Sequence, residues 1–204
     1  MKLPWNNEAE FYNLHSKQIF SEFPFYHLSM IGNTKEEFLN YIINSAKINS
    51  KSRVVDLGCG SGYVADSLNR LCECTGISTS QECVNQAKIN YPNANIKIAN
   101  METFSNKNST HFLALESMGY SDAGKTFKNV YKNLEKDGIF YIKDACKKNH
   151  ENYKEKESSF NDVSDIMNNS MYMESSKHHK VRFDKMPHEN VDFINAVEFI
   201  FMKQ

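Results

Sequence analysis

The sequence lacks the features that would mark it for export or place it in a membrane. Its first residues, MKLPWNNEAEFYNLH, contain no unbroken apolar segment followed by a small-residue cleavage site, as a signal peptide would. No stretch approaches the roughly 20 consecutive apolar residues that a membrane-spanning helix needs. We therefore expect a soluble, cytoplasmic protein without stable membrane association.

A strong charge of either sign is also absent. The 24 Lys and Arg residues nearly balance the 25 Asp and Glu residues, and the net charge is −1. No basic groove with interleaved aromatic residues is visible, so nucleic acid is not an expected partner. The 204 residues, 40% of them hydrophobic, suit one domain with a hydrophobic core.

The chain has little cysteine, and its five cysteines do not pair at metal-binding spacing. Only one residue separates Cys72 from Cys74, and no second pair follows at the distance of a zinc finger. An odd number of cysteines without an export signal favours free thiols. We expect buried cysteines and no metal site.

Helical and strand-like segments alternate along much of the chain. Helices are predicted at Thr34–Ile48, Gly62–Leu71, Ser80–Tyr91 and Ala123–Gly138. Short apolar strands are predicted at Arg53–Leu57, Cys72–Ser78, Asn95–Asn100, His111–Ser117 and Ile139–Ala145. This alternation indicates an α/β fold, with a mostly parallel sheet covered by helices on both faces.

The C-terminal part has a different pattern. A weak helix is predicted at 159–171, followed by strands at 178–186 and 196–204. Only a short connection separates these two strands, which is typical of antiparallel neighbours. We expect them to form an antiparallel edge of the sheet.

A glycine-rich turn, DLGCGSG, follows the first strand and begins the next helix. Gly58, Gly60 and Gly62 allow a sharp turn and a close approach of the backbone to a ligand, although glycines also end strands for structural reasons alone. The spacing differs from the dinucleotide pattern G-x-G-x-x-G, because Tyr63 stands at its third glycine. Asp56, just before the turn, suits a ligand with a cationic group better than a pyrophosphate.

These residues resemble motif I of class I S-adenosylmethionine-dependent methyltransferases. The resemblance runs from about Thr34 to about Lys147 and includes NIKIANMETF and FKNVYKNLEKDGIFYIKD. It implies a Rossmann-like, doubly wound, mostly parallel seven-stranded sheet with an antiparallel C-terminal strand. It also divides the domain into a lid segment (1–33), a cofactor-binding core (34–147) and a substrate-side part (148–204).

The resemblance assigns S-adenosyl-L-methionine as the cofactor and gives its contacts residue by residue. The methionine part is assigned to the turn, with Asp56 on the amino group; the adenosine part is assigned to the loops after the next strands. The implied cofactor residues are Asp56, Gly58, Cys59, Gly60, Gly62, Ser78, Thr79, Asn100, Met101 and Leu115. Alternatively, Asn100 only caps the following turn.

The second strand departs from the commonest family pattern. Its end, GISTS, has Ser78 where many relatives have an acid that holds the ribose. It resembles instead the branch written GITxS, which includes cyclopropane fatty acid synthases and tocopherol methyltransferases. That branch often has Gln where this chain has Cys83, which weakens the assignment of the ribose contact.

Candidate catalytic residues lie beyond the fourth strand and in the N-terminal segment. Glu116, in LESMGYSD, resembles an acid of the cyclopropane synthases and would hold bicarbonate, orient a polar acceptor or neutralise a cationic one; alternatively it caps a helix or faces solvent. Tyr26, His27 and Tyr120 are candidates for the acceptor pocket, with His27 a possible base. The favoured alternative is that the aromatic N-terminal segment simply packs on the edge of the sheet.

The expected activity is methyl transfer to a small-molecule acceptor by in-line displacement, which requires no fixed catalytic signature because the leaving group is already activated. The alternatives are cyclopropanation or C-methylation of a lipid, and a cofactor-binding homologue without activity. A nicotinamide oxidoreductase is disfavoured by the glycine spacing. The acceptor and the oligomeric state are not predicted.

Overall fold

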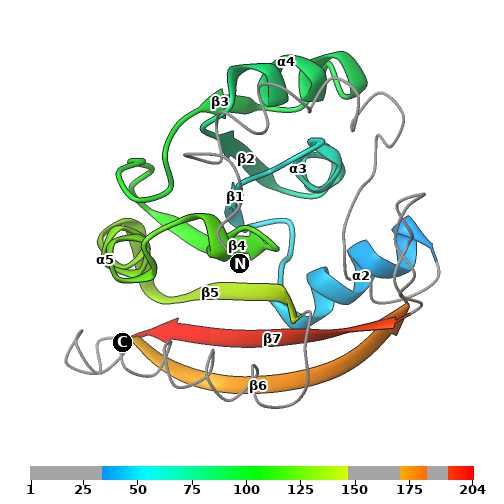
Figure 1. Cartoon of the computed structure of the whole chain (residues 1–204). Coiled ribbons are helices and arrows are strands. Elements are labelled where there is room, and N and C mark those ends of the chain that lie inside the picture. The colour runs from blue at the N-terminus through cyan, green and yellow to red at the C-terminus, as the bar shows by residue number, and fades with distance from the viewer. Residues whose placement is uncertain (1–33, 147–170, 183–192) are drawn as a thin grey trace.

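A seven-stranded sheet runs through the computed structural model, which describes residues 34–146, 171–182 and 193–204 (Figure 1). The strand order is β3-β2-β1-β4-β5-β7-β6. The strands are β1 (Arg53–Leu57), β2 (Glu73–Ser78), β3 (Ile96–Ile98), β4 (Ser109–Leu115), β5 (Leu134–Cys146), β6 (Met171–Arg182) and β7 (Phe193–Lys203).

The first five strands are mutually parallel, and β7 runs against both of its neighbours, β5 and β6. The expected mostly parallel sheet with a reversed C-terminal strand is thus confirmed. The strand order changes direction between β1 and β4. In open α/β sheets, ligands bind beyond the carboxyl ends of the strands at such a switch point.

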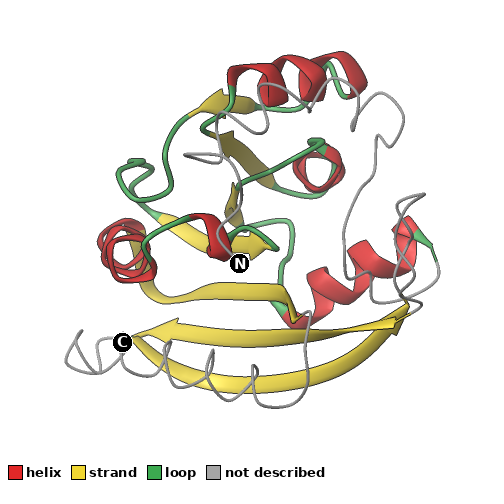
Figure 2. Ribbon diagram, in the orientation of Figure 1, coloured by secondary structure: helices red, strands yellow, loops and turns green. Residues whose placement is uncertain are grey.

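Helices cover both faces of the sheet (Figure 2). The helices α2 (Lys35–Ser45), α3 (Tyr63–Asn69) and α4 (Gln81–Asn90) lie on one side, and α5 (Ala123–Asn133) lies on the other, with a short 3-10 helix, η1 (Met118–Tyr120), before it. Thr34, Ser80 and Asp122 begin three of these helices, because each side chain accepts a hydrogen bond from the N–H three residues ahead.

Three apolar clusters among the described residues anchor the helices to the sheet, and the smallest packs Val84 and Ala87 of α4 against Ile96 of β3. On one face, Phe127 of α5 packs edge-on against Phe140 and Phe201, with ring centroids 5.1 and 4.9 Å away. On the other face, Phe38 of α2 and Leu68 of α3 join the inward-facing residues of β4 and β5. Burial of each such side chain contributes about 1.5–3 kcal/mol, so the strand ends are held on a rigid layer.

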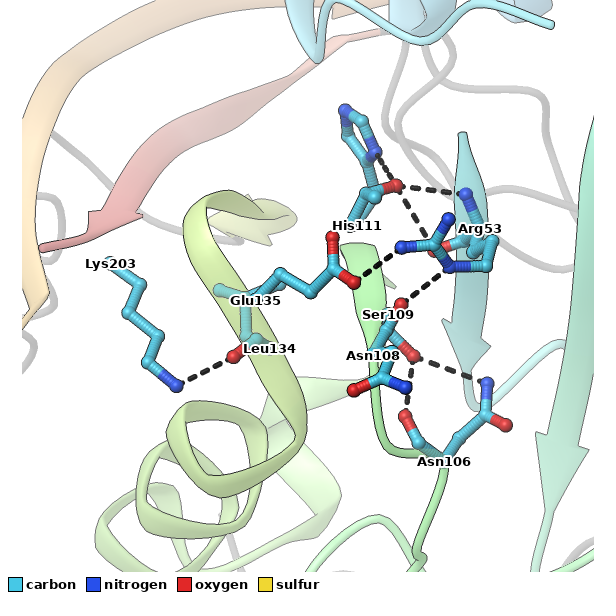
Figure 3. Close-up of polar contacts among 9 residues, drawn as sticks. Arg53, Asn106, Asn108, Ser109, His111, Leu134, Glu135 and Lys203 are labelled. Carbon is cyan, nitrogen blue, oxygen red and sulfur yellow. Dashed lines mark hydrogen bonds and ion pairs between the residues drawn. The ribbon is translucent and has the colours of Figure 1, made fainter. Parts of the chain in front are cut away.

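The predicted helix at Ala123–Gly138 is wrong at its C-terminal end, because α5 stops at Asn133. Leu134 is already extended, with φ −77° and ψ 137°. The Lys203 ammonium donates to the carbonyl oxygen of Leu134 at 2.6 Å (Figure 3). It also donates to the carbonyl oxygen of Tyr131 at 2.7 Å, and together these bonds satisfy the end of the helix. A lysine 69 residues beyond Leu134 in the sequence is a signal that local patterns do not contain.

The antiparallel edge was predicted correctly in kind but not in extent. β6 begins at Met171, where a helix end was expected, and β7 begins at Phe193. The rest of the expected helix, residues 159–170, lies outside the described residues, as does the connection 183–192. No helix in the part of the chain that the structure describes is long and apolar enough to cross a bilayer.

Candidate functional site

The glycine turn after β1 adopts a conformation that side chains disfavour. Gly58, Gly60 and Gly62 have φ values of 72°, 50° and 86°. A Cβ on Gly58 would lie 2.6 Å from the Cβ of Ser117, and one on Gly62 would lie 2.7 Å from the Cδ1 of Ile96. The turn therefore needs glycine both for its backbone angles and for its packing.

Three of the backbone N–H groups of this turn are used internally, including that of Gly62, which donates to the carbonyl oxygen of Cys59 at 2.9 Å. The N–H groups of Gly58 and Cys59 both donate to the carbonyl oxygen of Ile77, at 2.9 Å, and fasten the turn to β2. The N–H groups of Gly60 and Ser61 have no acceptor among the described residues. Gly60 and Ser61 therefore carry the two N–H donors of the turn that remain for a ligand.

Asp56 is a buried acid that has no partner among the residues that the structure describes. Its exposed fraction is 2%, and burial raises the pKa of its carboxyl group to about 7. Within the described ranges, no donor forms a hydrogen bond to this carboxylate and no cation pairs with it. An ionised carboxylate in such surroundings costs several kcal/mol. A cationic group of a ligand would remove that cost.

The GISTS segment at the end of β2 is explained largely by local structure. A Cβ on Gly76 would lie 2.9 Å from the Cβ of Cys59. The Ser78 hydroxyl accepts from the N–H of Ser80 at 3.2 Å, and the Ser80 hydroxyl in turn caps α4. Cys83 donates to the carbonyl oxygen of Gly60 at 3.1 Å. Cys83 thus connects α4 to the glycine turn, a role that its sequence position alone did not suggest.

A pocket opens beside the turn where three segments meet. The lining residues are Gly58, Ile77, Ser78, Thr79, Ala99 and Met101. The sequence-derived cofactor residues Gly58, Ser78, Thr79 and Met101 are thereby brought together. Ile77 and Ala99 were missed because apolar lining residues have no distinguishing pattern. Leu115 is buried at the end of β4, adjacent to Glu116.

Asn100 caps the turn that follows it, which is the alternative role that the sequence suggested. Its side-chain oxygen accepts from the N–H of Glu102 at 2.7 Å. Its carbonyl oxygen accepts from the N–H groups of Thr103 and Phe104, at 3.1 and 2.8 Å. The turn fixes the direction of the peptide between Asn100 and Met101, and the Met101 N–H has no acceptor among the described residues.

Glu116 occupies a strained position at the carboxyl end of the sheet. Its φ is 61°, a left-handed conformation that is uncommon for a residue with a side chain and often occurs at functional sites. Its N–H donates to the carbonyl oxygen of Lys143 at 2.7 Å. Ser117 and Asp122, rather than Glu116, precede the two following helices. The side chain is only 9% exposed, so it does not face solvent either.

A buried lysine accompanies Glu116. The Lys143 ammonium is fully buried, lies 2.9 Å from the Glu116 carboxylate and is 5.2 Å from the centre of the Phe38 ring. Sequence analysis missed this residue. The signal was present, because a lysine within the apolar segment IFYIKD requires an acidic partner when it is buried.

The described residues do not place the remaining candidate site residues at the pocket. Tyr120 ends η1 and is 37% exposed. Tyr26 and His27 lie outside the described residues. Cys59, Cys72, Cys74 and Cys83 are free and buried, and no group of three metal-ligating side chains occurs among the residues described. Burial raises the pKa of the Cys59 and Cys74 thiols, which makes both unreactive.

Comparison with protein families defines the class to which this site belongs. A family model described as a methyltransferase domain matches residues 48–191, well over half of the chain. The chain therefore belongs to this methyltransferase family, and its methyl donor is S-adenosyl-L-methionine. No curated protein matches the sequence.

Solved structures support the same fold at low sequence identity. The [4+2]-cyclase SpnF superposes with a TM-score of 0.71 and 13% identity, covering 96% of this chain and 95% of that one. A geranyl diphosphate methyltransferase, in complex with its diphosphate ligand GPP and sinefungin, gives 0.66 and 10%, covering 96% and 98%. A TehB-like SAM-dependent methyltransferase from Corynebacterium glutamicum gives 0.63 and 14%, covering 96% and 98%.

Proposed function

We propose that the chain transfers the methyl group of S-adenosyl-L-methionine to a small-molecule acceptor by in-line displacement. The observation that carries this proposal is the buried Asp56, which has no partner within the described ranges and lies beside a glycine turn that keeps two N–H donors for a ligand. An acid and adjacent N–H donors match the ammonium and carboxylate groups of an amino acid. The site therefore fits the amino-acid end of this cofactor.

The methionine end of the cofactor is assigned to the turn. Asp56 pairs with the ammonium group, and the Gly60 and Ser61 N–H groups donate to the carboxylate. Gly58, Cys59 and Gly62 shape the turn without presenting side chains to the ligand. When bound, the cofactor supplies a methyl group on a positively charged sulfur, which departs as a neutral thioether.

The adenosine end is assigned to the pocket. The hydroxyl groups of Ser78 and Thr79 bind the ribose, since Ser78 retains a proton to donate after accepting from Ser80. The Met101 N–H meets the edge of the adenine ring, Asn100 shapes this edge contact, and the Leu115 backbone completes the wall. This arrangement corresponds to the GITxS branch, in which no acid holds the ribose.

Glu116 is assigned to the acceptor. Lys143 balances the charge of its carboxylate, so the site is suited to a neutral acceptor that donates a hydrogen bond to this acid. The chain's part in the reaction is then to orient the acceptor and exclude water, which accounts for much of the barrier reduction in such displacements. Tyr26, His27 and Tyr120 are proposed to border the acceptor. The GPP-bound geranyl diphosphate methyltransferase supports a small-molecule acceptor.

A second candidate is a different reaction on the same cofactor-binding fold. SpnF, a [4+2]-cyclase, superposes well on this chain, so the fold is compatible with chemistry other than methyl transfer. Cyclopropanation or C-methylation of a lipid would use Glu116 near the reacting carbons. An inactive homologue would bind the cofactor without transferring its methyl group.

The first experiment measures cofactor affinity by isothermal titration calorimetry. Gly60→Val places a β-branched side chain at a left-handed position of the turn, and we expect S-adenosylmethionine binding to fall below detection. The matched control is Gly119→Ala. Gly119 is exposed, and a Cβ there meets nothing within 4 Å, so affinity should stay unchanged.

Folding is checked in both variants by circular dichroism and thermal unfolding. If Gly60→Val does not fold, Asp56→Asn, which keeps the side-chain volume, replaces it. Unchanged affinity in a folded Gly60→Val protein would contradict the assignment of the turn. Transfer of labelled methyl groups to a panel of small hydroxy, amino and thiol compounds, with phospholipid vesicles in a parallel reaction, then separates the two candidate functions.

A further inference from the structure

Asn129, on the helix α5, holds the loop after β3 at two points. Its single amide nitrogen donates to the carbonyl oxygens of Met101 and Phe104, at 2.9 and 2.8 Å. An amide group has two N–H bonds, and both are used here to hold one short loop. Hydrogen bonds from α5 therefore hold the loop at two points.

Other residues of α5 and its N-cap hold the same loop on either side. The Asn133 amide donates to the Phe104 carbonyl oxygen at 3.3 Å, and its side-chain oxygen accepts from the N–H of Asn106 at 3.0 Å. At the N-cap, the N–H of Asp122 donates to Glu102 at 2.9 Å. Of these contacts, only the bonds of Asn129 reach Met101, the loop residue that lines the pocket together with Ala99.

The two peptide groups that flank Met101 are both fixed. The turn at Asn100 fixes the first, which carries the Met101 N–H, because the Asn100 carbonyl accepts two hydrogen bonds. Asn129 fixes the second, because it binds the Met101 carbonyl oxygen. The direction of the Met101 N–H is thus set by contacts on both sides of the residue.

We propose that Asn129 is a positioning residue that gives the cofactor pocket its selectivity for adenine. A fixed backbone N–H group can donate to a ring nitrogen that has a lone pair, such as N1 of adenine. It rejects a base that has a hydrogen at that position, such as hypoxanthine, because two donors then face each other without an acceptor. This inference rests on the adenosine placement given under Proposed function.

The test compares two inhibitors that differ only in the base, S-adenosylhomocysteine and S-inosylhomocysteine. We expect the wild-type protein to prefer the adenine compound by at least about tenfold, the typical value of one hydrogen bond together with a rejected donor. Asn129→Ala should bind the adenine compound about tenfold more weakly and lose most of this preference. Asn129→Ser, which keeps one donor, should give an intermediate preference.

The control variant removes an amide of comparable structural importance elsewhere. Asn69 accepts from the N–H of Cys74 at 3.0 Å, at the end of β2 remote from the pocket. Asn69→Ala should lower thermal stability but leave the ratio of the two affinities unchanged. If Asn129 had only a structural role, Asn129→Ala would weaken the binding of both compounds equally. An unchanged ratio of the two affinities in Asn129→Ala would therefore overturn the proposal.

The outcomes for this inference and for the proposed function are distinct. Failure of the wild-type protein to bind S-adenosylhomocysteine would contradict the proposed function itself. Binding with equal affinity for both compounds would leave the cofactor site intact but overturn the adenine selectivity. Binding with discrimination that survives in Asn129→Ala and Asn129→Ser would overturn only the role of Asn129.

Discussion

The two ends of the sheet treat their polar groups differently. At the amino end, Arg53 donates to the carbonyl oxygen of Asn108 at 2.6 Å and pairs with Glu135 at 2.5 Å (Figure 3). Asn106 and Ser109 bind each other, and the Lys203 ammonium satisfies carbonyl oxygens at the end of α5. These polar groups satisfy one another through hydrogen bonds and an ion pair within the chain.

At the carboxyl end, several polar groups have no partner in the described part of the chain. Asp56 is buried without a partner in the described part of the chain, and the N–H donors of Gly60 and Ser61 have no acceptor there. Glu116 is held in a strained conformation. Arg53 and Asp56 belong to the same five-residue strand, so the contrast arises within β1 and reflects which end of the sheet each residue occupies.

The comparison teaches that an unmet polar group is informative when its desolvation cost is high. The amino end does contain two exceptions, since Nε2 of His111 and Nδ2 of Asn69 are buried and have no hydrogen-bond partner among the described residues. The Asn69 amide is uncharged, and burial lowers the pKa of His111, so its ring stays neutral; the cost of leaving such neutral groups unpaired is smaller than for a charge. An unpaired carboxylate costs far more, and Asp56 is therefore the stronger indication of a ligand.

The largest expected effect comes from breaking the buried ion pair between Lys143 and Glu116 at the carboxyl end of the sheet. Lys143→Met should destabilise the protein by about 3–5 kcal/mol, because Glu116 loses the partner that balances its charge in a buried site. Urea unfolding measures this change. The matched control is Lys47→Met, whose pair with Glu174 is equally short, 2.9 Å, but more than half of the Lys47 side chain is exposed. It should cost less than about 1 kcal/mol.

The double variant Lys143→Met/Glu116→Gln isolates the charge from the packing. We expect it to recover much of the lost stability, since replacement of a whole buried pair is often neutral. If Lys143→Met is as mild as Lys47→Met, burial does not make the Glu116–Lys143 pair more important to stability than an exposed pair.

The next effect concerns the ionisation of Asp56. Because its pKa is about 7 in the folded protein, cofactor affinity should fall by about tenfold between pH 8 and pH 6, as the carboxylate proposed to pair with the ammonium becomes protonated. Calorimetry with S-adenosylhomocysteine over this range measures the slope. Asp56→Asn should bind more weakly and show no such slope. A wild-type affinity that is constant with pH would contradict the pairing.

The same shift has a consequence for the free protein. A carboxyl group whose folded pKa is raised favours folding below its unfolded pKa, and this contribution is lost as pH rises from about 4 to about 7. The loss is on the order of 4 kcal/mol. Asp56→Asn should therefore be more stable than the wild-type protein at pH 8 in the absence of cofactor. Stability would then be exchanged for ligand binding at this position.

Much of the fold was predictable because its signals are local. The alternation of helix and strand patterns gave the parallel sheet, and the glycine spacing with Asp56 located the turn. The extent of α5 was not predictable, because Lys203 ends that helix from the far end of the chain. For the site, Ser78 and Thr79 followed from the resemblance to a family, whereas Lys143 and Asn129 depend on contacts between distant segments.

Asn100 shows a limit of motif-based assignment. Its place in the motif implied an adenine contact, but its side-chain oxygen accepts a hydrogen bond within its own turn. A position in a motif identifies where a residue lies along the chain. The hydrogen bonds that the residue makes decide whether it faces the ligand or supports the backbone that does.

The smallest expected effect lies at the amino end. Arg53→Ala should lower stability by no more than about 1 kcal/mol, because the side chains of Arg53 and Glu135 are each 40% exposed and solvent screens their attraction. Cofactor affinity should not change, since a satisfied network at this end has no ligand to serve. Urea unfolding and calorimetry are run on the same protein sample. A drop in affinity comparable to that of Asp56→Asn would mean that the two ends of β1 are coupled and that the division between them is incorrect.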